Sequence, residues 1–396
     1  MLFRFFKISL GALAFCQLGL GFPSKCLKHF KKLSPTELRY PDPQFLKEHQ
    51  GKYSLEIKPS AVSDQCGYGS CWVHARLSHL EQQILNKTGK EMKLSRQFLI
   101  VQSLLDRIDS ALQSPASGVF QGGNAHYADE LIKRYGVIPD DPSVWKPKVN
   151  FEKAPHAGRL TYFLNARAAQ FHQEAKDLTP ESKAYLDLQD KARKDMRDIL
   201  RAYTGTLPRK IKVAGQEITP RAFAKSLGKD HAPKPLWVFP EVELLEGNLK
   251  KESSIGPAPL PSSAPSSRES LDKIEARIIR SLKNGQSVTL SYENNTLFVD
   301  RDTGIMSLQA FNTPEGFQPP PRLYRDAFLS GSGYHAVDIV GVDLDSAGKI
   351  TKLKIKNSWG DEAGDRGFYH MYRDYFLHFM NSIYISDSQL TKSDPR

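Results

Sequence analysis

A short stretch near the N-terminal third of the chain carries side chains that can form an acyl bond. In residues 65–72, Cys71 follows a glycine turn and stands directly before a run with helical periodicity. Exposed N–H groups and the dipole at a helix start favour the thiolate, the nucleophilic form of cysteine. Gln65 lies six positions earlier, and its side-chain amide can donate to an oxyanion beside the backbone N–H of Cys71. The alternative is a buried cysteine that packs as a small apolar residue.

Two later stretches supply a base and a group to orient it. Residues 333–341 read as a strand entered from a glycine turn and contain His335. Residues 353–360 alternate with period two, which places Asn357 on the face of two apolar residues. An imidazole can take a thiol proton near neutral pH, and an asparagine carbonyl can hold its tautomer. We predict that both side chains join the cysteine in a catalytic group, with Trp359 shielding their hydrogen bond from water.

These stretches, in this order, resemble the papain-like cysteine peptidases. The resemblance is closest to the bleomycin hydrolase and aminopeptidase C branch and covers roughly residues 50–386. Further segments that carry it are residues 94–99, 122–124, 133–139 and 368–376. One position departs from the family pattern, which has a cysteine three residues before the nucleophile. Tyr68 occupies that position here, and the cysteine stands at Cys66 instead.

The resemblance implies an α+β, two-lobe fold, with an active-site cleft between a helical lobe and an antiparallel β lobe. It implies hydrolysis of a peptide or protein substrate through a thioester acyl-enzyme. Cys71 would attack the carbonyl, His335 would protonate the leaving amine, and Asn357 would orient His335. Gln65 would stand in the oxyanion hole. No cofactor is expected.

Gly122 and Gly123 have no side chains, so a peptide backbone can approach them closely. The resemblance implies that they pair with the extended backbone of the substrate, and that Trp359 also lines the substrate site. An ordinary loop turn before the next helix would use the same two glycines.

The first 22 residues read as a secretory signal peptide. Arg4 and Lys7 precede an apolar run over residues 8–22, and Gly19 and Gly21 have the spacing of a cleavage site. An uncleaved anchor or a buried helix would have the same composition. We predict an exported protein, secreted or periplasmic, and no later stretch is apolar and long enough to span a membrane.

The four cysteines can then be placed. Cys16 would leave with the signal peptide and Cys71 is the nucleophile. Cys26 and Cys66 are therefore the candidates for a disulfide in an oxidising compartment. The alternative is two free buried thiols. A metal site is not expected, because Cys66, Cys71 and His74 lack a second ligand pair.

Composition and periodicity organise the remaining chain. With 396 residues, 40% hydrophobic and 25% charged, it has enough length for two or three domains with ample core. Helical patterns come first and strand patterns last, which is typical of an α+β chain. The predicted parts are a signal peptide (1–22), an N-terminal arm or pro-segment (23–48), a helical lobe with the nucleophile (49–145), a basic helical insertion (146–252), a Pro/Ser-rich linker (253–268), a β lobe with the histidine and asparagine (269–386) and a polar tail (387–396).

The net charge of +11 is concentrated in the insertion. Residues 146–234 contain 19 lysines and arginines against 10 acidic residues. A solvated helical face explains such a run, and binding to an anionic surface is the alternative. Aromatic residues are not interleaved with the basic ones, so we do not expect nucleic-acid binding. The sequence carries no signal for an oligomeric state.

The C-terminal tail bears on which bond is cut. In the bleomycin hydrolase branch the chain's own C-terminus lies in the cleft and restricts the enzyme to trimming N-termini. Residues 387–396 are short and polar here, with few apolar side chains to hold them in a cleft. We therefore favour an endopeptidase over an aminopeptidase. A catalytically silent binding module and an acyl transferase, which passes the thioester to an amine, are the alternatives on the same fold.

Overall fold

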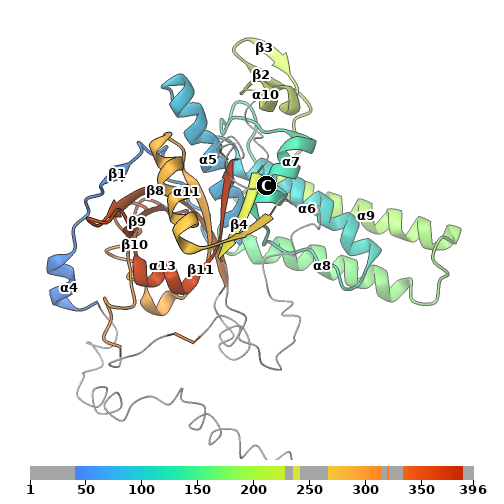
Figure 1. Cartoon of the computed structure of the whole chain (residues 1–396). Helices are drawn as coiled ribbons and strands as arrows, with labels where there is room; N and C mark the ends of the chain where they lie inside the picture. The colour runs from blue at the N-terminus through green and yellow to red at the C-terminus, as the bar shows by residue number, and fades with distance from the viewer. Residues whose placement is uncertain (1–40, 228–234, 241–265, 314–318, 321–332, 387–396) are drawn as a thin grey trace, which may run out of the picture.

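The computed structural model describes residues 41–227, 235–240, 266–313, 319–320 and 333–386. Helices predominate in the first half of the chain and strands in the second, so the predicted α+β class is confirmed (Figure 1). The helices are α4 (Pro43–Glu48), α5 (Cys71–Thr88), α6 (Arg96–Gln113), α7 (Ala125–Tyr135), α8 (His156–Glu174), α9 (Lys183–Thr204), α10 (Pro220–Ser226), α11 (Leu271–Lys283), the 3-10 helix η3 (Thr296–Phe298) and α13 (Arg373–Phe379). The strands are β1 (Leu55–Glu56), β2 (Ile211–Val213), β3 (Gln216–Ile218), β4 (Pro235–Pro240), β5 (Ser266–Glu269), β6 (Val288–Glu293), β7 (Ile305–Met306), β8 (Tyr334–Leu344), β9 (Ile350–Lys356), β10 (Phe368–Tyr372) and β11 (Met380–Ser386).

Local capping explains where the first helices begin and end. The predicted cap Ser95 accepts a hydrogen bond from the backbone N–H of Phe98 at 3.3 Å and starts α6. Asn124 caps α7 in the same way through the N–H of Tyr127. At the other end of α5, Gly89 takes the left-handed conformation that commonly closes a helix.

The predicted insertion packs into the same core as the helices before it. α8 and α9 run side by side and extend away from the sheet, against α6 (Figure 1). The buried side chains that the insertion adds to this core include Phe151, Leu160, Leu164, Phe171, Met196 and Leu200. Burying these apolar groups together with α5 and α6 makes the helical half one hydrophobic unit.

Many basic side chains of α9 are paired with acids. Arg193 contacts Asp109 of α6 at 2.8 Å, and Lys183 and Lys194 contact acids one helical turn later. Such exposed pairs are typical of a solvated helical face. They support that explanation of the charge, while binding to an anionic surface stays a prediction.

The sheet is mainly antiparallel, with the strand order β5-β4-β11-β6-β8-β9-β10-β7 and β1 paired to β8. Two pairs, β4 with β5 and β10 with β7, are parallel. α11 and α13 bury their apolar faces against the same core as the strands. Within the described part of the chain, no helix is both long and apolar enough to cross a bilayer.

Two predicted boundaries differ from the structure. Residues 235–240 were expected in the insertion and residues 266–268 in the linker, but they form β4 and much of β5. Both strands are short and flanked by proline-rich sequence, so their local composition does not indicate a strand. Their strand conformation depends on pairing with neighbours in the sheet. The rest of the linker, the signal peptide and the polar tail lie outside the described residues. Of the N-terminal arm, residues 41–48 are described, and α4 within them begins at Pro43.

Buried polar contacts fix α5 against the sheet. Lys356, at the end of β9, reaches Ser60 Oγ at 2.7 Å and Ser78 Oγ of α5 at 2.9 Å through its Nζ. His79 Nδ1 lies 3.0 Å from Ser287 Oγ beside β6. Burial lowers the pKa of Lys356 to about 8. This lysine therefore holds the strand that carries Asn357 to the helix that carries Cys71.

Two glycine substitutions test the packing of the helical half. Gly136 has φ +81°, and a Cβ there would lie 2.1 Å from the carbonyl carbon of Pro220. We expect Gly136→Ala to lower the free energy of unfolding by about 2–4 kcal/mol, from backbone strain and the clash together. Gly158 is an exposed residue of α8 with open space at its Cβ. Gly158→Ala, the matched control, should raise stability by about 0.5–1 kcal/mol. Urea unfolding of both variants measures this, and similar midpoints would contradict the account.

Candidate active site

The structure brings together the three elements that carry the predicted catalytic side chains. Cys71 is the first residue of α5, His335 lies near the start of β8, and Asn357 directly follows β9. β8 and β9 are antiparallel neighbours, and α5 packs on β8. The half-buried thiol of Cys71 interacts with the backbone N–H of Ala336, the residue after His335.

Burial, rather than the helix start, dominates the protonation of the thiol. It raises the pKa of Cys71, while the backbone N–H groups of Ala336, Trp72 and Cys71 itself lower it by less. The N–H groups at the helix start therefore favour the thiolate, as predicted, but burial outweighs them in the resting protein. Desolvation penalises the charged form more than the terminal N–H groups stabilise it.

The imidazole of His335 has a fixed tautomer. Its Nε2 lies 2.8 Å from Asn357 Oδ1, which also accepts the backbone N–H of Ser358 at 2.7 Å. Because a backbone N–H can only donate, the second contact identifies that atom as the amide oxygen. Nε2 must then carry the hydrogen, and the lone pair stands on Nδ1. The ring is ready to accept a proton at Nδ1.

Aromatic rings enclose this imidazole. Trp359 stacks on it with ring centroids 4.8 Å apart, and Tyr292 meets it edge-on at 5.8 Å. Burial lowers the pKa of His335 to about 4, although the hydrogen bond that its Nε2 donates to Asn357 raises it. Near neutral pH the thiol and the imidazole are therefore both uncharged, and the thiol proton must move as the nucleophile forms.

Gln65 joins the loop before α5 to the segment after β9. Its Nε2 donates to the carbonyl of Tyr68 at 2.8 Å, and its Oε1 accepts the hydroxyl of Ser358 at 2.6 Å. The backbone N–H of Gln65 also donates to the carbonyl of Ser358 at 2.9 Å. One side-chain N–H remains for a developing oxyanion, and both ends of the amide are held in place.

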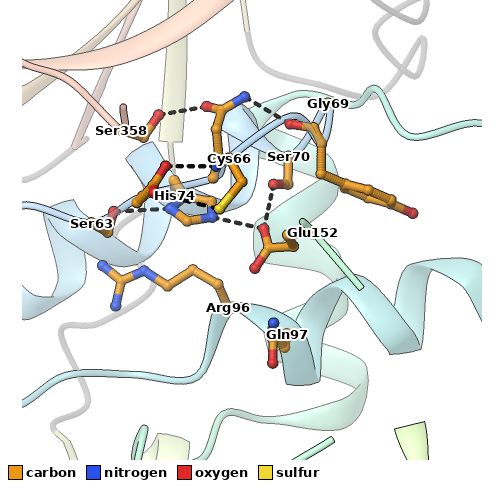
Figure 2. Close-up of polar contacts among 12 residues, drawn as sticks. Ser63, Cys66, Gly69, Ser70, His74, Arg96, Gln97, Glu152 and Ser358 are labelled. Atoms are coloured by element: carbon orange, nitrogen blue, oxygen red, sulfur yellow. Dashed lines mark hydrogen bonds and ion pairs between the residues drawn. The ribbon is translucent and has the colours of Figure 1, made fainter. Parts of the chain in front are cut away.

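A buried cluster beneath Cys71 was not anticipated from the sequence. Glu152 Oε1 accepts the hydroxyl of Ser70 at 2.7 Å and lies 3.0 Å from His74 Nε2. His74 Nδ1 in turn lies 2.9 Å from Ser63 Oγ, so His74 stands between Ser63 and Glu152 (Figure 2). His74 follows Cys71 by three residues on α5 and was considered above only as a metal ligand, whereas nothing in the sequence around Glu152 indicates its role.

The two glycines lie in the loop before α7. A Cβ on Gly123 would come within 2.6 Å of the ring of Trp72, so this glycine permits close packing on α5. A Cβ on Gly122 would meet nothing within 4 Å, and its carbonyl accepts the guanidinium of Arg107. Their predicted contact with a substrate backbone stays a prediction, as does that of Trp359.

Cys66 is a free thiol in a strained turn. It has φ +52°, and its Sγ lies 3.4 Å from Asp64 Oδ2 while its N–H donates to Asp64 Oδ1 at 2.7 Å. Burial, followed by the Asp64 carboxylate, raises the pKa of this thiol to about 11. Cys26 lies outside the described residues. The structure therefore gives the predicted Cys26–Cys66 disulfide no support.

A cavity of about 460 Å³ opens beside His335. Gln65 and Trp359 also line it, which places it against the candidate oxyanion donor and the ring that covers the imidazole. Tyr369 of β10 and Arg301, in the turn before β7, also line it, and both contact the ring of Trp359.

Comparison with known proteins adds independent findings. The profile of the peptidase C1-like family matches residues 267–395. Cysteine proteinase 1, mitochondrial, of Saccharomyces cerevisiae is 22% identical over 365 residues, which cover 84% of this chain and 75% of that protein. Aminopeptidase C of Streptococcus thermophilus is 23% identical, over 81% of this chain and 79% of its own length. The crystal structure of PepW from Lactobacillus rhamnosis superimposes with a TM-score of 0.75 at 19% identity, over 97% of this chain and 93% of that chain.

These relatives overturn the predicted export. The yeast protein is mitochondrial by name and the bacterial one is an aminopeptidase, and neither finding indicates a secreted or periplasmic enzyme. An apolar run behind basic residues is a compositional signal, and it did not suffice to assign the compartment. The run lies outside the described residues. The disulfide prediction assumed an oxidising compartment, and it loses that basis once the predicted export is overturned.

The family match covers the strands beside His335 and Asn357, and the two sequence relatives align with more than 80% of the chain, so their similarity extends into the helical half. The shared fold of PepW agrees with a helical half packed on a mainly antiparallel sheet. Taken together, the chain is similar to the peptidase C1-like family and to the bleomycin hydrolase and aminopeptidase C proteins, and these similarities support a cysteine peptidase.

Proposed function

We propose that the chain hydrolyses peptide bonds through a thioester formed on Cys71. The observation that carries this proposal is the hydrogen bond from His335 Nε2 to Asn357 Oδ1, because it leaves Nδ1 free as the base. Gln65 supports it further, since its amide is fixed at both ends beside the nucleophile loop. Each of these groups has one role in acyl transfer.

The chemistry proceeds in two halves. His335 Nδ1 takes the thiol proton while Cys71 Sγ attacks the substrate carbonyl carbon. The oxyanion accepts the N–H of Cys71 and the remaining side-chain N–H of Gln65. The C–N bond then breaks, and His335 returns the proton to the leaving amine. Water attacks the thioester, His335 takes a proton from it, and release of the carboxylic acid restores the thiol.

Burial of the resting pair has a catalytic consequence. An uncharged thiol and an uncharged imidazole need no counter-ion where both groups are buried. Charge develops only as the substrate carbonyl is attacked, where the N–H groups of Cys71 and Gln65 are oriented to receive it. Trp359 keeps water from competing for Asn357, and the open space at Gly122 leaves room for the acyl part of the substrate.

Substitution of the three side chains tests their separate roles. Cys71→Ala and His335→Ala should each lower kcat/KM by at least about 10³-fold, because each removes a group that forms a bond or carries a proton. Asn357→Ala should cost less, roughly 10²-fold, because it only orients the base. Thermal unfolding of each variant controls for loss of fold. A larger loss in Asn357→Ala than in His335→Ala would contradict the assignment.

The pH dependence follows from the buried imidazole. His335 accepts a proton only when neutral, and its pKa is lowered to about 4. The acidic limb of kcat/KM should therefore lie near pH 4, and it should move lower in Asn357→Ala, because that hydrogen bond raises the pKa. A limb at pH 6.5, the value of a free imidazole, would be incompatible with the buried site.

Stability must be controlled in this experiment. The unfolded chain binds more protons at His335 between pH 6.5 and about 4, so the contribution of this residue to the free energy of unfolding falls as pH falls through that window. Preincubation at each pH, followed by assay at pH 7, separates reversible titration from unfolding.

The bond that is cut can be decided with paired substrates. The relatives compared above include an aminopeptidase, whereas the short polar tail favours internal cleavage, which stays our prediction. One peptide is prepared with a free and with an acetylated N-terminus, and we expect both to be cleaved at comparable rates. Cleavage of the free form alone, with deletion of residues 387–396 releasing cleavage of the acetylated form, would show that the tail gates the cleft.

A further inference from the structure

The cavity beside His335 has a polar wall that the proposed chemistry does not use. His335 protonates the leaving amine in that chemistry, so the space against His335 and Trp359 receives the leaving fragment. The lining residues that have no part in bond cleavage include Asn294, Arg301 and Tyr369. Asn294 directly follows β6, Arg301 lies in the turn before β7, and Tyr369 belongs to β10, so three separate segments converge on this wall.

Arg301 presents an unpaired cation to this space. Its guanidinium lies over the ring of Trp359, 5.4 Å from the centroid, and no acidic side chain in the described parts of the chain pairs with it. The carbonyl of Arg301 accepts the N–H of Gly364 at 2.7 Å, which fixes the turn. An arginine stacked on an aromatic face keeps the edge of its planar fork available for a carboxylate.

Two buried polar atoms of the wall also lack partners within the described structure. These are the hydroxyl of Tyr369 and the side-chain oxygen of Asn294. Tyr369 packs edge-on against Trp359 at 5.3 Å, and burial raises its pKa to about 12, so the hydroxyl is a donor at neutral pH. Arg301 acts electrostatically on the same hydroxyl, which places the two donors near each other. Both atoms are shielded from solvent within the wall. Because buried polar groups normally have partners, a ligand that enters the cavity can satisfy them after a small shift of the two side chains.

The acidic groups nearby are already engaged or lie apart from the wall. Asp64 lines the cavity, but its two oxygens accept from the N–H and the thiol of Cys66. Asp300 accepts the hydroxyl of Thr303 at 2.5 Å and closes its own turn. Asp302 is exposed on that turn and does not line the cavity. Arg301 is therefore the cation that the lining offers to a ligand, and the Asp64 carboxylate, held by Cys66, is the anion of the same lining.

We propose that this wall selects leaving fragments that carry a carboxylate, which Arg301 and Tyr369 bind by charge-assisted hydrogen bonds. The inference rests on the proposed peptidase function and specifies its substrate class. Asn294 accepts an N–H of the same fragment through its side-chain oxygen. The carboxylate has two sources of the same chemistry: the side chain of the first leaving residue, or the terminal carboxylate of a leaving fragment one residue long.

Matched peptides distinguish the two sources. In the first arm, amidated peptides of one sequence carry Glu, Gln or Lys as the first leaving residue. In the second arm, peptides with a single leaving residue end in a free acid or an amide. We expect kcat/KM to be about three- to tenfold higher for the carboxylate in the arm that matches the source, because an exposed guanidinium gives a modest gain. The preference should weaken as salt is raised.

Variants assign the preference to the wall. Arg301→Gln should remove it while leaving kcat/KM for the Gln and amide peptides nearly unchanged, and Tyr369→Phe, which keeps the ring, should reduce it. Arg366→Gln is the matched control, because Arg366 is exposed, pairs only with its neighbour Asp365 among the described residues and does not line the cavity. Equal rates for carboxylate and amide in both arms, or a preference that survives Arg301→Gln, would overturn the proposal.

Binding measurements separate this inference from the proposed chemistry. Cys71→Ala cannot form the thioester, so dissociation constants of the same peptides can be measured on it without turnover. If the carboxylate peptides bind more tightly, and Arg301→Gln abolishes this difference, carboxylate binding at this wall is supported even if cleavage fails. Equal dissociation constants for carboxylate and amide peptides would refute the proposed carboxylate preference even if cleavage proceeds.

Discussion

The site depends on a short row of hydrogen bonds between two segments almost 300 residues apart. Residues 60–65, before α5, run beside residues 356–360, which begin at the last residue of β9. Lys356 reaches Ser60, the side chain and backbone of Gln65 meet Ser358, and the N–H of Gly360 donates to the carbonyl of Ser63. Because these contacts fix the register between helix and sheet, they also fix where Asn357 meets His335. A shift by one residue would turn Asn357 to the other face of its strand.

Desolvation governs the electrostatics of the same region. Cys71 begins a helix, His335 has a hydrogen-bonded oxygen, and both features favour charge. Burial outweighs them in each case, raising the pKa of the thiol and lowering that of the imidazole. Asp338 follows the same rule, since burial raises its pKa to about 6 despite its proximity to Lys356. At Cys71 and His335 the site therefore holds two neutral groups, and the reaction itself creates the charge.

Local signals in the sequence predicted much of the framework. Ser95 as a helix cap, the helix that starts at Cys71 and the alternating strand before Asn357 are confirmed by the structure. These features depend on neighbours within about one helical turn or one strand. β4 was missed, because a short strand between prolines becomes evident only when β11 and β5 pair with it.

The parts of the site that sequence reasoning missed are non-local. Glu152 lies 82 residues from Ser70 and joins it only after the helices have packed. Arg301 and Tyr369 are ordinary residues of a turn and a strand, and their shared wall exists only in the folded protein. The prediction of the compartment was wrong for another reason. The composition of residues 1–22 fits several kinds of segment, and composition alone does not distinguish between them.

The contact between Glu152 and His74 makes the predicted insertion part of the catalytic half. Both side chains are buried, so removing residues 146–252 would leave His74 and Ser70 facing an emptied interior without their acceptor. A leucine or phenylalanine at position 74 would likewise leave the buried carboxylate of Glu152 without its partner at that position. Positions 74 and 152 should consequently covary among descendants of this chain, so that a smaller enzyme could arise from it only by changing the first turn of α5 at the same time.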